Sequence, residues 1–225
     1  MFKKVLIIGA SRGLGCAIVR FLPEHLGSVE SLTCVSRRNS DSVEAKILTL
    51  DMSKPLDQEF LGKEIEREKF DLVIYSAGGG PHGEFVKKDW KDHFWALQVG
   101  LIAPMYLSLA WLKMRGADPS KNAQGPGRFV IVGSRIAESN PDPLAASYAA
   151  SKHGLIGFVS SVQGEVSESR SRIWLFSPGY INTPLLPASA PVRHNGVKIL
   201  SPDTAAQALL RWVKKEDGPW HRVLS

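Results

Sequence analysis

The sequence has few cysteines and no long hydrophobic run, and each shortage restricts what the chain can be. Its 225 residues include 2 cysteines, Cys16 and Cys34, without the spacing of a metal site, so we predict free, buried thiols and no bound metal. No apolar run approaches the roughly 18–20 residues of a membrane span. The apolar stretch 5–8 is too short for a signal peptide. We therefore expect a cytoplasmic protein without a membrane segment.

The chain also lacks a concentrated patch of one charge. Its formal net charge is +6, but the basic residues are dispersed, with only short pairs such as 37–38 and 214–215. A nucleic-acid-binding protein usually gathers its positive charge into a stripe or patch. We therefore predict no nucleic-acid partner, and binding of DNA or RNA is the least favoured hypothesis for this chain.

Short apolar runs alternate with longer helical patterns along the whole chain. This alternation is typical of a parallel sheet covered by helices. No repeat, low-complexity tract or linker divides the chain, so we predict a single domain over residues 1–225. The predicted strands are 3–9, 31–36, 46–50, 71–77, 128–134, 172–179 and 220–225, and the predicted helices are 13–26, 56–68, 90–114, 147–166 and 201–215.

Two stretches are predicted to be irregular. Residues 117–127 form a polar, turn-rich pattern that we expect to be a surface connector. Residues 185–200 are rich in proline and apolar side chains, and they follow the carboxyl end of a predicted strand. Because ligands bind outside these strand ends in open α/β sheets, we predict that 185–200 is a substrate lid.

A glycine-rich motif lies between the first predicted strand and the first predicted helix. Glycines at this place allow a tight turn, and they let backbone N–H groups approach a pyrophosphate at the helix N-terminus. The spacing is GxxxGxG, and a plain strand-to-helix turn is the structural alternative. The strand–turn–helix context favours a dinucleotide site. Its residues are Gly9, Ser11, Arg12, Gly13, Leu14 and Gly15.

Tyr148 and Lys152 are four residues apart on a predicted helix, so they project from the same face. The Lys152 ammonium is expected to favour the phenolate of Tyr148 and to lower the pKa of that phenol from about 10. Such a tyrosine can act as a general acid in carbonyl reduction. An isolated pair of this kind is more often a solvated helix face, but the glycine motif at the start of the chain favours the catalytic interpretation.

Together these motifs resemble the short-chain dehydrogenase/reductase family, in the same order and over nearly the whole chain. The glycine motif is similar to the family's TGxxxGxG, with Ile8 in place of the threonine. The segment YSAGG stands where the family has NNAG, so Ala77 and Gly78 match while Tyr75 and Ser76 do not. The resemblance implies an α/β fold with a doubly wound, Rossmann-type, mostly parallel sheet and helices on both faces.

The resemblance also implies the roles of individual residues. Ser134 would polarise a substrate carbonyl, Tyr148 would transfer a proton, and Lys152 would hold the nicotinamide ribose. Asp51 and Met52 in TLDMS would flank the adenine. The segment SPGYINTP is similar to the family's PGxxxT and would cover the nicotinamide with Pro178, Gly179, Ile181 and Thr183. The implied activity is an oxidoreductase interconverting a small-molecule carbonyl and an alcohol.

The choice of cofactor can be argued from charge. Sites that prefer NAD place an acidic side chain at the end of the second strand, where it accepts from the ribose 2′-hydroxyl. Here that place reads Ser36-Arg37, without a carboxylate. Arg37 could bind a 2′-phosphate, and Arg12 could contact it from the other side. Two exposed arginines of a solvated turn are the structural alternative, but we predict NADP(H) over NAD(H).

One departure from the family concerns catalysis. Family members carry an asparagine on the long middle helix, and its backbone carbonyl anchors a proton-relay water; here Gly100 stands at that place. A glycine keeps its carbonyl but can widen the helix. Gly100 and the altered NNAG motif favour an alternative hypothesis, in which the chain is a catalytically weak NADP(H)-binding regulatory or redox-sensing protein on the same fold.

The predicted helices at about 93–114 and 147–166 carry apolar residues around much of their circumference. A helix that is apolar on both faces needs burial beyond its own sheet. The residues that carry this argument are Trp95, Trp111, Phe158 and Val162, and we predict a homodimer or homotetramer. We expect Trp95, Trp111 and Trp212 to lie in the core or in subunit contacts, His82 to be a surface or rim residue, and His153 to be structural. The substrate determinants are expected in loops 79–88, 138–147 and 185–200.

Overall fold

All strands of the structure belong to one parallel sheet. In this computed structural model, residues 2–38, 44–116, 127–137, 141–166, 171–215 and 218–224 are described. The sheet has seven strands in the order β3-β2-β1-β4-β5-β6-β7. Every neighbouring pair is parallel, which confirms the predicted fold class. The strands are β1 (Lys4–Ile8), β2 (Ser31–Ser36), β3 (Lys46–Thr49), β4 (Leu72–Tyr75), β5 (Gly127–Val132), β6 (Ser171–Pro178) and β7 (His221–Leu224).

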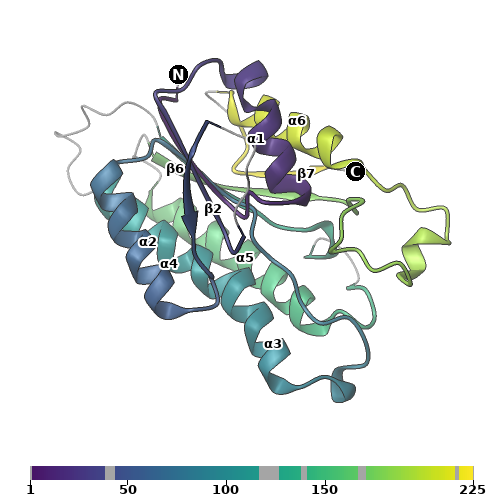
Figure 1. The fold of residues 1–225 in the computed structure, drawn as a ribbon. Coiled ribbons are helices and arrows are strands. Elements are labelled where there is room, and N and C mark those ends of the chain that lie inside the picture. Colours follow the sequence, from purple (N-terminus) through teal and green to yellow (C-terminus); the bar gives the residue numbers. More distant parts are fainter. Residues whose placement is uncertain are drawn as a thin grey trace.

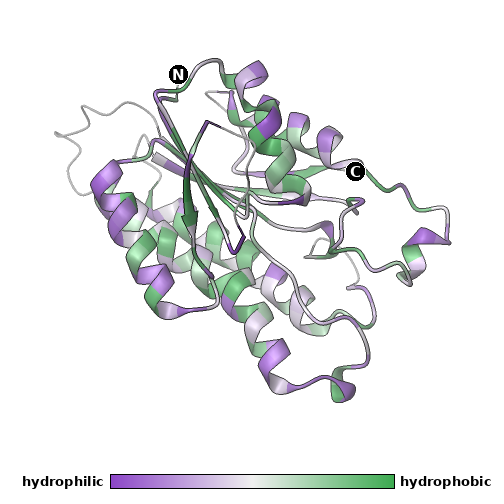
Figure 2. Cartoon of the chain, in the orientation of Figure 1, coloured by the Kyte–Doolittle hydropathy of each residue, from purple (hydrophilic) through white to green (hydrophobic). Residues whose placement is uncertain are grey.

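Helices cover both faces of the sheet (Figure 1). One face carries α1 (Gly13–Leu26) and α6 (Pro202–Val213), which pack on each other. The opposite face carries α2 (Pro55–Glu68), α4 (Ala103–Gly116) and α5 (Ala146–Glu165). The hydrophobic sides of these helices face the sheet in Figure 2. Each face therefore has its own apolar core, and the strands between them read as continuous apolar runs.

Large aromatic side chains occupy both cores. On the α4 side, Trp111 is fully buried, its ring centroid lies 5.9 Å from that of Phe129, and its indole N–H donates to the Phe70 carbonyl at 2.9 Å. On the α6 side, Trp212 stacks on Trp174 at 4.4 Å. The core positions expected for Trp111 and Trp212 are confirmed. Of the two cysteines, Cys34 is buried as expected, whereas Cys16 is exposed, so the prediction of two buried thiols was wrong for Cys16.

The long middle helix predicted over 90–114 is not a single α-helix. It begins as α3 (Trp90–Leu97), passes through a π-helical turn at Gln98–Ile102, here called η2, and continues as α4. A π-helical turn holds one extra residue per turn, and such turns occur mostly at functional sites. Gly100 lies at the centre of this turn, so the widening expected at this glycine is present.

The same stretch is apolar enough to pass for a membrane span. Among the described residues, Trp90–Arg115 is the one helical stretch of sufficient length and composition, with a mean hydropathy of 1.4 over its most apolar window. Half of that window is buried inside the protein. Because a core helix that covers a sheet has this same composition, the stretch gives only weak support for a membrane segment.

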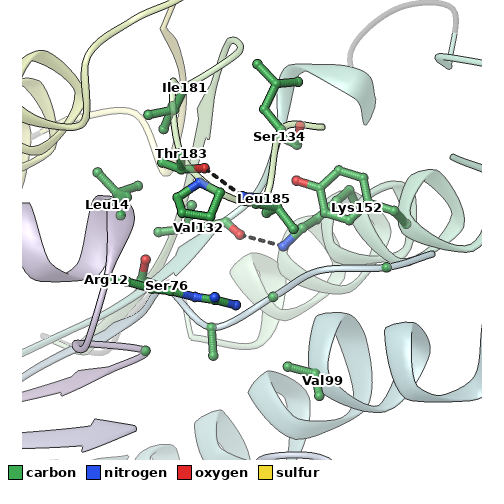
Figure 3. A pocket seen from close by; sticks show the side chains of 18 of the residues that line it. Arg12, Leu14, Ser76, Val99, Val132, Ser134, Lys152, Ile181, Thr183 and Leu185 are labelled. Atoms are coloured by element: carbon green, nitrogen blue, oxygen red, sulfur yellow. Dashed lines mark hydrogen bonds between the residues drawn. The ribbon is translucent and has the colours of Figure 1, made fainter. Parts of the chain in front are cut away.

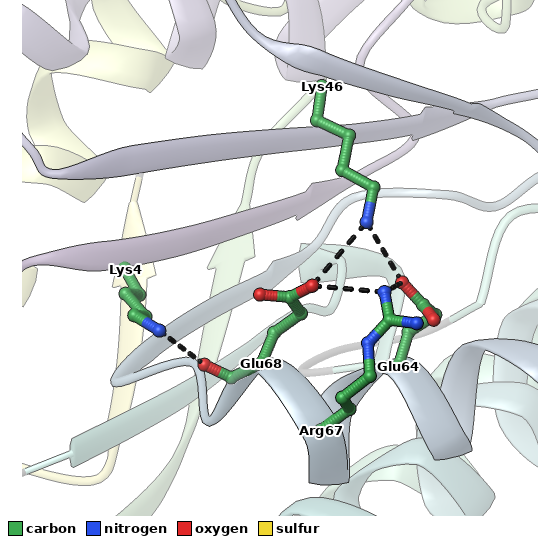
Figure 4. Close-up of polar contacts among 5 residues, drawn as sticks. All are labelled: Lys4, Lys46, Glu64, Arg67 and Glu68. Atoms are coloured by element: carbon green, nitrogen blue, oxygen red, sulfur yellow. Dashed lines mark hydrogen bonds and ion pairs between the residues drawn. The ribbon is translucent and has the colours of Figure 1, made fainter.

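An ion-pair network fastens the edge strand β3 to α2 (Figure 4). The Lys46 ammonium lies 3.0 Å from Glu64 and 3.5 Å from Glu68. Arg67 donates to Glu64 at 2.6 Å, and Lys4 of β1 donates to the Glu68 carbonyl at 3.1 Å. The Glu64 side chain is only 8% exposed, so water screens this network less than it screens a surface pair. The network holds the short strand that leads into Asp51.

Candidate functional site

A deep cavity of about 290 Å³ opens at the carboxyl ends of the strands. The chain reverses its direction of winding between the neighbouring strands β1 and β4, and ligands bind at such switch points in open α/β sheets. Every predicted site residue except Gly15 lines this cavity. The lining residues among them are Gly9, Ser11, Arg12, Gly13, Leu14, Arg37, Asp51, Met52, Ala77, Gly78, Ser134, Tyr148, Lys152, Pro178, Gly179, Ile181 and Thr183.

The glycine turn has the geometry of a phosphate cradle. Gly9 has a φ of +89°, and a Cβ there would lie 2.6 Å from the Ala77 nitrogen. Gly15 does not reach the cavity, but a Cβ on it would lie 2.1 Å from the Gly9 carbonyl oxygen, so this glycine allows α1 to approach the turn. Arg12, the residue before α1, makes no side-chain cap, and Gly13 and Leu14 of the first turn line the cavity. These features fit the pyrophosphate of a dinucleotide.

Lys152 is the buried cation of the site. Its ammonium donates to the Val132 carbonyl at 2.9 Å, at the end of β5 (Figure 3). The residue is 4% exposed, and burial lowers its pKa to about 8. A Cβ on Gly78 would lie 3.4 Å from the ammonium nitrogen, so the glycine leaves room for the lysine. The buried position confirms that Lys152 does not belong to a solvated helix face.

Tyr148 lies one helical turn before Lys152 and is half-buried. The Lys152 ammonium lies 5.6 Å from the centroid of the Tyr148 ring. The expected lowering of the phenol pKa was wrong for this structure. Burial raises the pKa of Tyr148, the Ser134 hydroxyl counteracts this by hydrogen bonding, and the charge of Asp142 raises the pKa further. The phenol is therefore protonated at neutral pH, which is the form that a proton donor needs.

Ser134 stands at the end of β5, where the chain turns into a short 3₁₀ helix, Arg135–Ala137. Its hydroxyl oxygen accepts from the Ile136 N–H at 3.3 Å. In Figure 3 its side chain lies on the side of the pocket opposite Arg12, while Ile181, Thr183 and Leu185 come from the loop after β6. The structure thus brings the predicted serine, tyrosine and lysine together at one end of the cavity and the glycine turn to the other.

The π-helical turn shows why Gly100 carries no side chain. A Cβ on Gly100 would lie 2.6 Å from the Ser151 hydroxyl oxygen and 3.0 Å from the Ser151 Cβ. The neighbouring Val99 carbonyl accepts from the Tyr75 hydroxyl at 2.7 Å. Tyr75, which does not match the family motif, is therefore a fully buried anchor for this turn, and burial raises its pKa. No sequence pattern indicated this contact.

Trp95 and His82 lie at the cavity, and His153 lies at the surface. Trp95 packs against the core on the α4 side of the sheet, as expected, and it also lines the cavity. The Arg37 guanidinium lies 5.5 Å from the centroid of the Trp95 ring, across the space between the second strand and α3. His82 also lines the cavity, whereas His153 is exposed and bonds to the Ala149 carbonyl of its own helix.

Asp142 and Tyr180 line the cavity but were not predicted as site residues. The Tyr180 hydroxyl lies 2.6 Å from both carboxylate oxygens of Asp142. Asp142 falls in the predicted substrate loop 138–147, of which 138–140 lie outside the described residues. Tyr180 occupies a variable position of the PGxxxT motif. The available signal was the place of Asp142 in a predicted substrate loop. Nothing in the sequence indicated that the two side chains meet.

Part of the predicted lid lines the cavity, namely Leu185, Leu186 and Pro187. Arg193 holds this part in place, since it donates to the Pro187 carbonyl at 2.9 Å, to the Leu186 carbonyl at 2.8 Å and to the Asn182 side chain at 3.1 Å. The remainder of 185–200 lies away from the cavity lining. Movement of this segment stays a prediction.

Comparison with known proteins identifies the family. The sequence profile of the short chain dehydrogenases matches residues 3–192. The chain belongs to the short-chain dehydrogenase family. The prediction of an oxidoreductase of this family is confirmed. Among the described residues of this family member, no group of three His, Cys, Asp or Glu side chains is arranged to hold a metal ion.

Individual relatives agree with this assignment. D-beta-hydroxybutyrate dehydrogenase of Rhizobium meliloti is 28% identical over 203 residues, which cover 85% of this chain and 76% of the relative. Among solved structures, 4-hydroxyisoleucine dehydrogenase complexed with NADH has a TM-score of 0.82 at 20% identity and covers 99% of this chain and 96% of its own. A short-chain dehydrogenase from Sphingobium yanoikuyae in complex with NADPH has a TM-score of 0.79 at 20% identity, over 98% and 87% of the two chains.

We predict that side chains at Gly100 destabilise the protein. Gly100→Ala should lower the free energy of unfolding by about 1–3 kcal/mol, because the new Cβ collides with Ser151. Gly157→Ala is the matched control, since a Cβ there meets nothing within 4 Å, and it should raise the free energy by about 0.5–1 kcal/mol. Urea unfolding measures both. Gly100→Asn should lower the turnover number for carbonyl reduction in steady-state kinetics. A gain in turnover would show that Gly100 limits catalysis.

We also predict a pH-dependent stability from Lys152. Between pH 8 and its ordinary pKa of 10.5, the unfolded chain holds a proton on Lys152 that the folded chain has released, so the contribution of Lys152 to stability should rise with pH. Lys152→Met lacks this dependence, and the stability of wild type relative to the variant should rise by about 3 kcal/mol over the window. Urea unfolding at several pH values measures it. Lys63→Met, at an exposed position of α2, is the control, and a constant difference between wild type and Lys152→Met would contradict the prediction.

Proposed function

We propose that the protein is an NADP(H)-dependent oxidoreductase that interconverts a small-molecule carbonyl and an alcohol, with Tyr148 as general acid and base. The observation that carries this proposal is the meeting of Ser134, Tyr148 and Lys152 in the cavity that also contains the glycine cradle. A cradle alone would fit any dinucleotide-binding protein. The added phenol, hydroxyl and buried ammonium are the groups that carbonyl reduction needs.

Each side chain has a separate task in this proposal. When bound, the reduced nicotinamide supplies the hydride that is added to the carbonyl carbon. The Ser134 hydroxyl donates a hydrogen bond to the substrate oxygen and stabilises the negative charge that develops there. Tyr148 transfers its phenolic proton to that oxygen. Lys152 holds the ribose hydroxyls, and its positive charge favours the phenolate that Tyr148 becomes. In alcohol oxidation the same groups act in reverse.

The preference for NADP(H) rests on the charges around the adenosine end of the cavity. Arg12, Arg37 and Arg38 all line the cavity, and β2 ends without a carboxylate. The structural relatives named above carry NADH in one case and NADPH in the other, so the preference depends on this chain's own residues. Arg37 would exchange its contact with Trp95 for a charge-assisted bond to the 2′-phosphate.

Two observations favoured the alternative, a catalytically weak regulatory protein, and packing accounts for both of them. Gly100 is explained by the contact with Ser151, and the altered NNAG motif by the bond from Tyr75 to Val99.

The proposed homo-oligomer needs other interface residues than those that we expected from the sequence. Trp111 is buried within the chain, whereas the exposed apolar residues of the middle helix lie elsewhere. They are Trp90, Phe94, Ile102, Tyr106 and Leu109.

Removing the phenol hydroxyl tests the mechanism. Tyr148→Phe should lower the turnover number for carbonyl reduction by about 10²–10⁴, because a positioned general acid is lost. The affinity for NADPH should stay nearly unchanged, because Lys152 still contacts the ribose. Steady-state kinetics over a panel of aldehydes, ketones and diketones, with calorimetry of NADPH binding, measures both. Tyr106→Phe, on the exposed side of α4, is the matched control, and wild-type turnover in Tyr148→Phe would refute the mechanism.

Cofactor selectivity is tested at Arg37. Wild type should bind NADPH more tightly than NADH by about 1–3 kcal/mol, the contribution of hydrogen bonds between charged groups. Arg37→Ala should lose most of this difference and keep its affinity for NADH. Arg20→Ala removes an exposed arginine that pairs with Asp203, and this control should keep the full difference. Equal dissociation constants of wild type for the two cofactors, measured by calorimetry, would rule the preference out.

A further inference from the structure

Beyond the proposed catalytic residues, a carboxylate, Asp142, lines the cavity. A second hollow of about 210 Å³ adjoins it, and Ser134, Asp142 and Tyr180 line both. Asp142 and Arg135 are the charged side chains among the described lining residues of this second hollow. The charge of Asp142 reaches the reacting group, because this carboxylate raises the pKa of the Tyr148 phenol. The carboxylate is therefore within electrostatic range of a substrate bound at Tyr148.

Asp142 retains acceptor capacity that the protein itself does not use. A carboxylate offers about four lone-pair positions, and the described residues supply a single donor, the Tyr180 hydroxyl at 2.6 Å. None of the ion pairs among the described residues includes Asp142. The nearby Arg135 is exposed, and its charge lowers the pKa of Tyr180 without pairing with the carboxylate. Tyr180 thus orients Asp142 and leaves its other positions open to the hollow.

We propose that Asp142, oriented by Tyr180, determines substrate specificity by accepting a hydrogen bond from a cationic ammonium or, more weakly, a hydroxyl near the reacting carbon. The preferred substrates are then amino alcohols and the corresponding amino ketones, followed by diols, and carboxylates are disfavoured. The proposal rests on the proposed oxidoreductase function.

Binding of an ammonium at Asp142 also affects the proton transfer. The free carboxylate opposes formation of the Tyr148 phenolate, which is the base that takes the proton in alcohol oxidation. A substrate cation beside Asp142 offsets this negative charge. The phenolate then forms more easily while such a substrate is bound. Recognition and activation therefore favour the same class of substrate, whereas a carboxylate substrate would add a second negative charge next to the phenol.

Two matched series of secondary alcohols test the specificity with NADP⁺. One consists of 1-amino-2-propanol, 1,2-propanediol and lactate, and the other of 4-amino-2-butanol, 1,3-butanediol and 3-hydroxybutyrate. The members of a series differ in carrying an ammonium, a hydroxyl or a carboxylate, and the two series differ in spacing. In at least one series, kcat/KM of wild type should be highest for the ammonium and lowest for the carboxylate. Asp142→Asn should reduce the ammonium-to-carboxylate ratio by about tenfold to a hundredfold, mainly through KM.

The variants separate recognition from a structural role. Tyr180→Phe keeps the charge but loses the orienting bond, so it should retain part of the preference. Asp89→Asn removes an exposed aspartate that pairs only with Lys91, and its ratio should equal that of wild type. With the neutral diols, Asp142→Asn should shift the pH profile of oxidation to lower pH, because a charge that raises the Tyr148 pKa is gone. A loop-anchoring role alone would not move this profile.

The outcomes distinguish this proposal from the proposed function. Turnover of alcohols with the same ammonium-to-carboxylate ratio in wild type and Asp142→Asn would overturn the role of Asp142 and leave the oxidoreductase intact. Absence of turnover for every alcohol and carbonyl tried would overturn the oxidoreductase. In that case calorimetry of 1-amino-2-propanol and 4-amino-2-butanol binding to the NADP⁺ complex decides the role of Asp142. Binding that Asp142→Asn abolishes upholds the role, and its absence in wild type refutes it.

Discussion

The arrangement of the site depends on one buried ammonium. Lys152 lies inside the protein, its charge is stabilised by the Val132 carbonyl at the end of β5, and its pKa falls to about 8 as a result of burial. Burying a charge is costly unless it is bonded, so α5 can pack only where this carbonyl is within reach. Gly78 lies beside this ammonium, since a Cβ there would be 3.4 Å from the Lys152 nitrogen. The lysine thereby sets the position of α5 against the sheet, and with it the position of Tyr148 one turn earlier.

The two departures from the family pattern form a single structural unit. Tyr75 ends β4 and holds the Val99 carbonyl, and the next residue, Gly100, lies against Ser151 of α5. The π-helical turn between α3 and α4 brings these contacts together. Together these two residues hold the π-helical turn of the middle helix against α5.

The sequence predicted the features that local backbone requirements impose. The glycine turn, the seven strands and the shared helical face of Tyr148 and Lys152 all follow from spacing within short segments, and the structure agrees with them. The features that it missed depend on burial or on contacts between distant segments. Tyr180 meets Asp142 across 38 positions, and the pKa of Tyr148 rises because packing removes water from it. Trp95 packs against the core as expected, but its place in the cavity wall was missed because helical spacing alone does not distinguish the two.

The two ends of the cavity differ in the charged side chains that line them. Arg12, Arg37 and Arg38 line one end, and Asp142 lines the other, with Arg135 in the adjoining hollow. The three arginines would attract the phosphates of an anionic dinucleotide to their end, which favours one orientation of the cofactor. With the proposed cofactor at the arginines and the proposed cationic substrate at Asp142, one cavity holds both ligands side by side. Neither ligand then competes for the other's place.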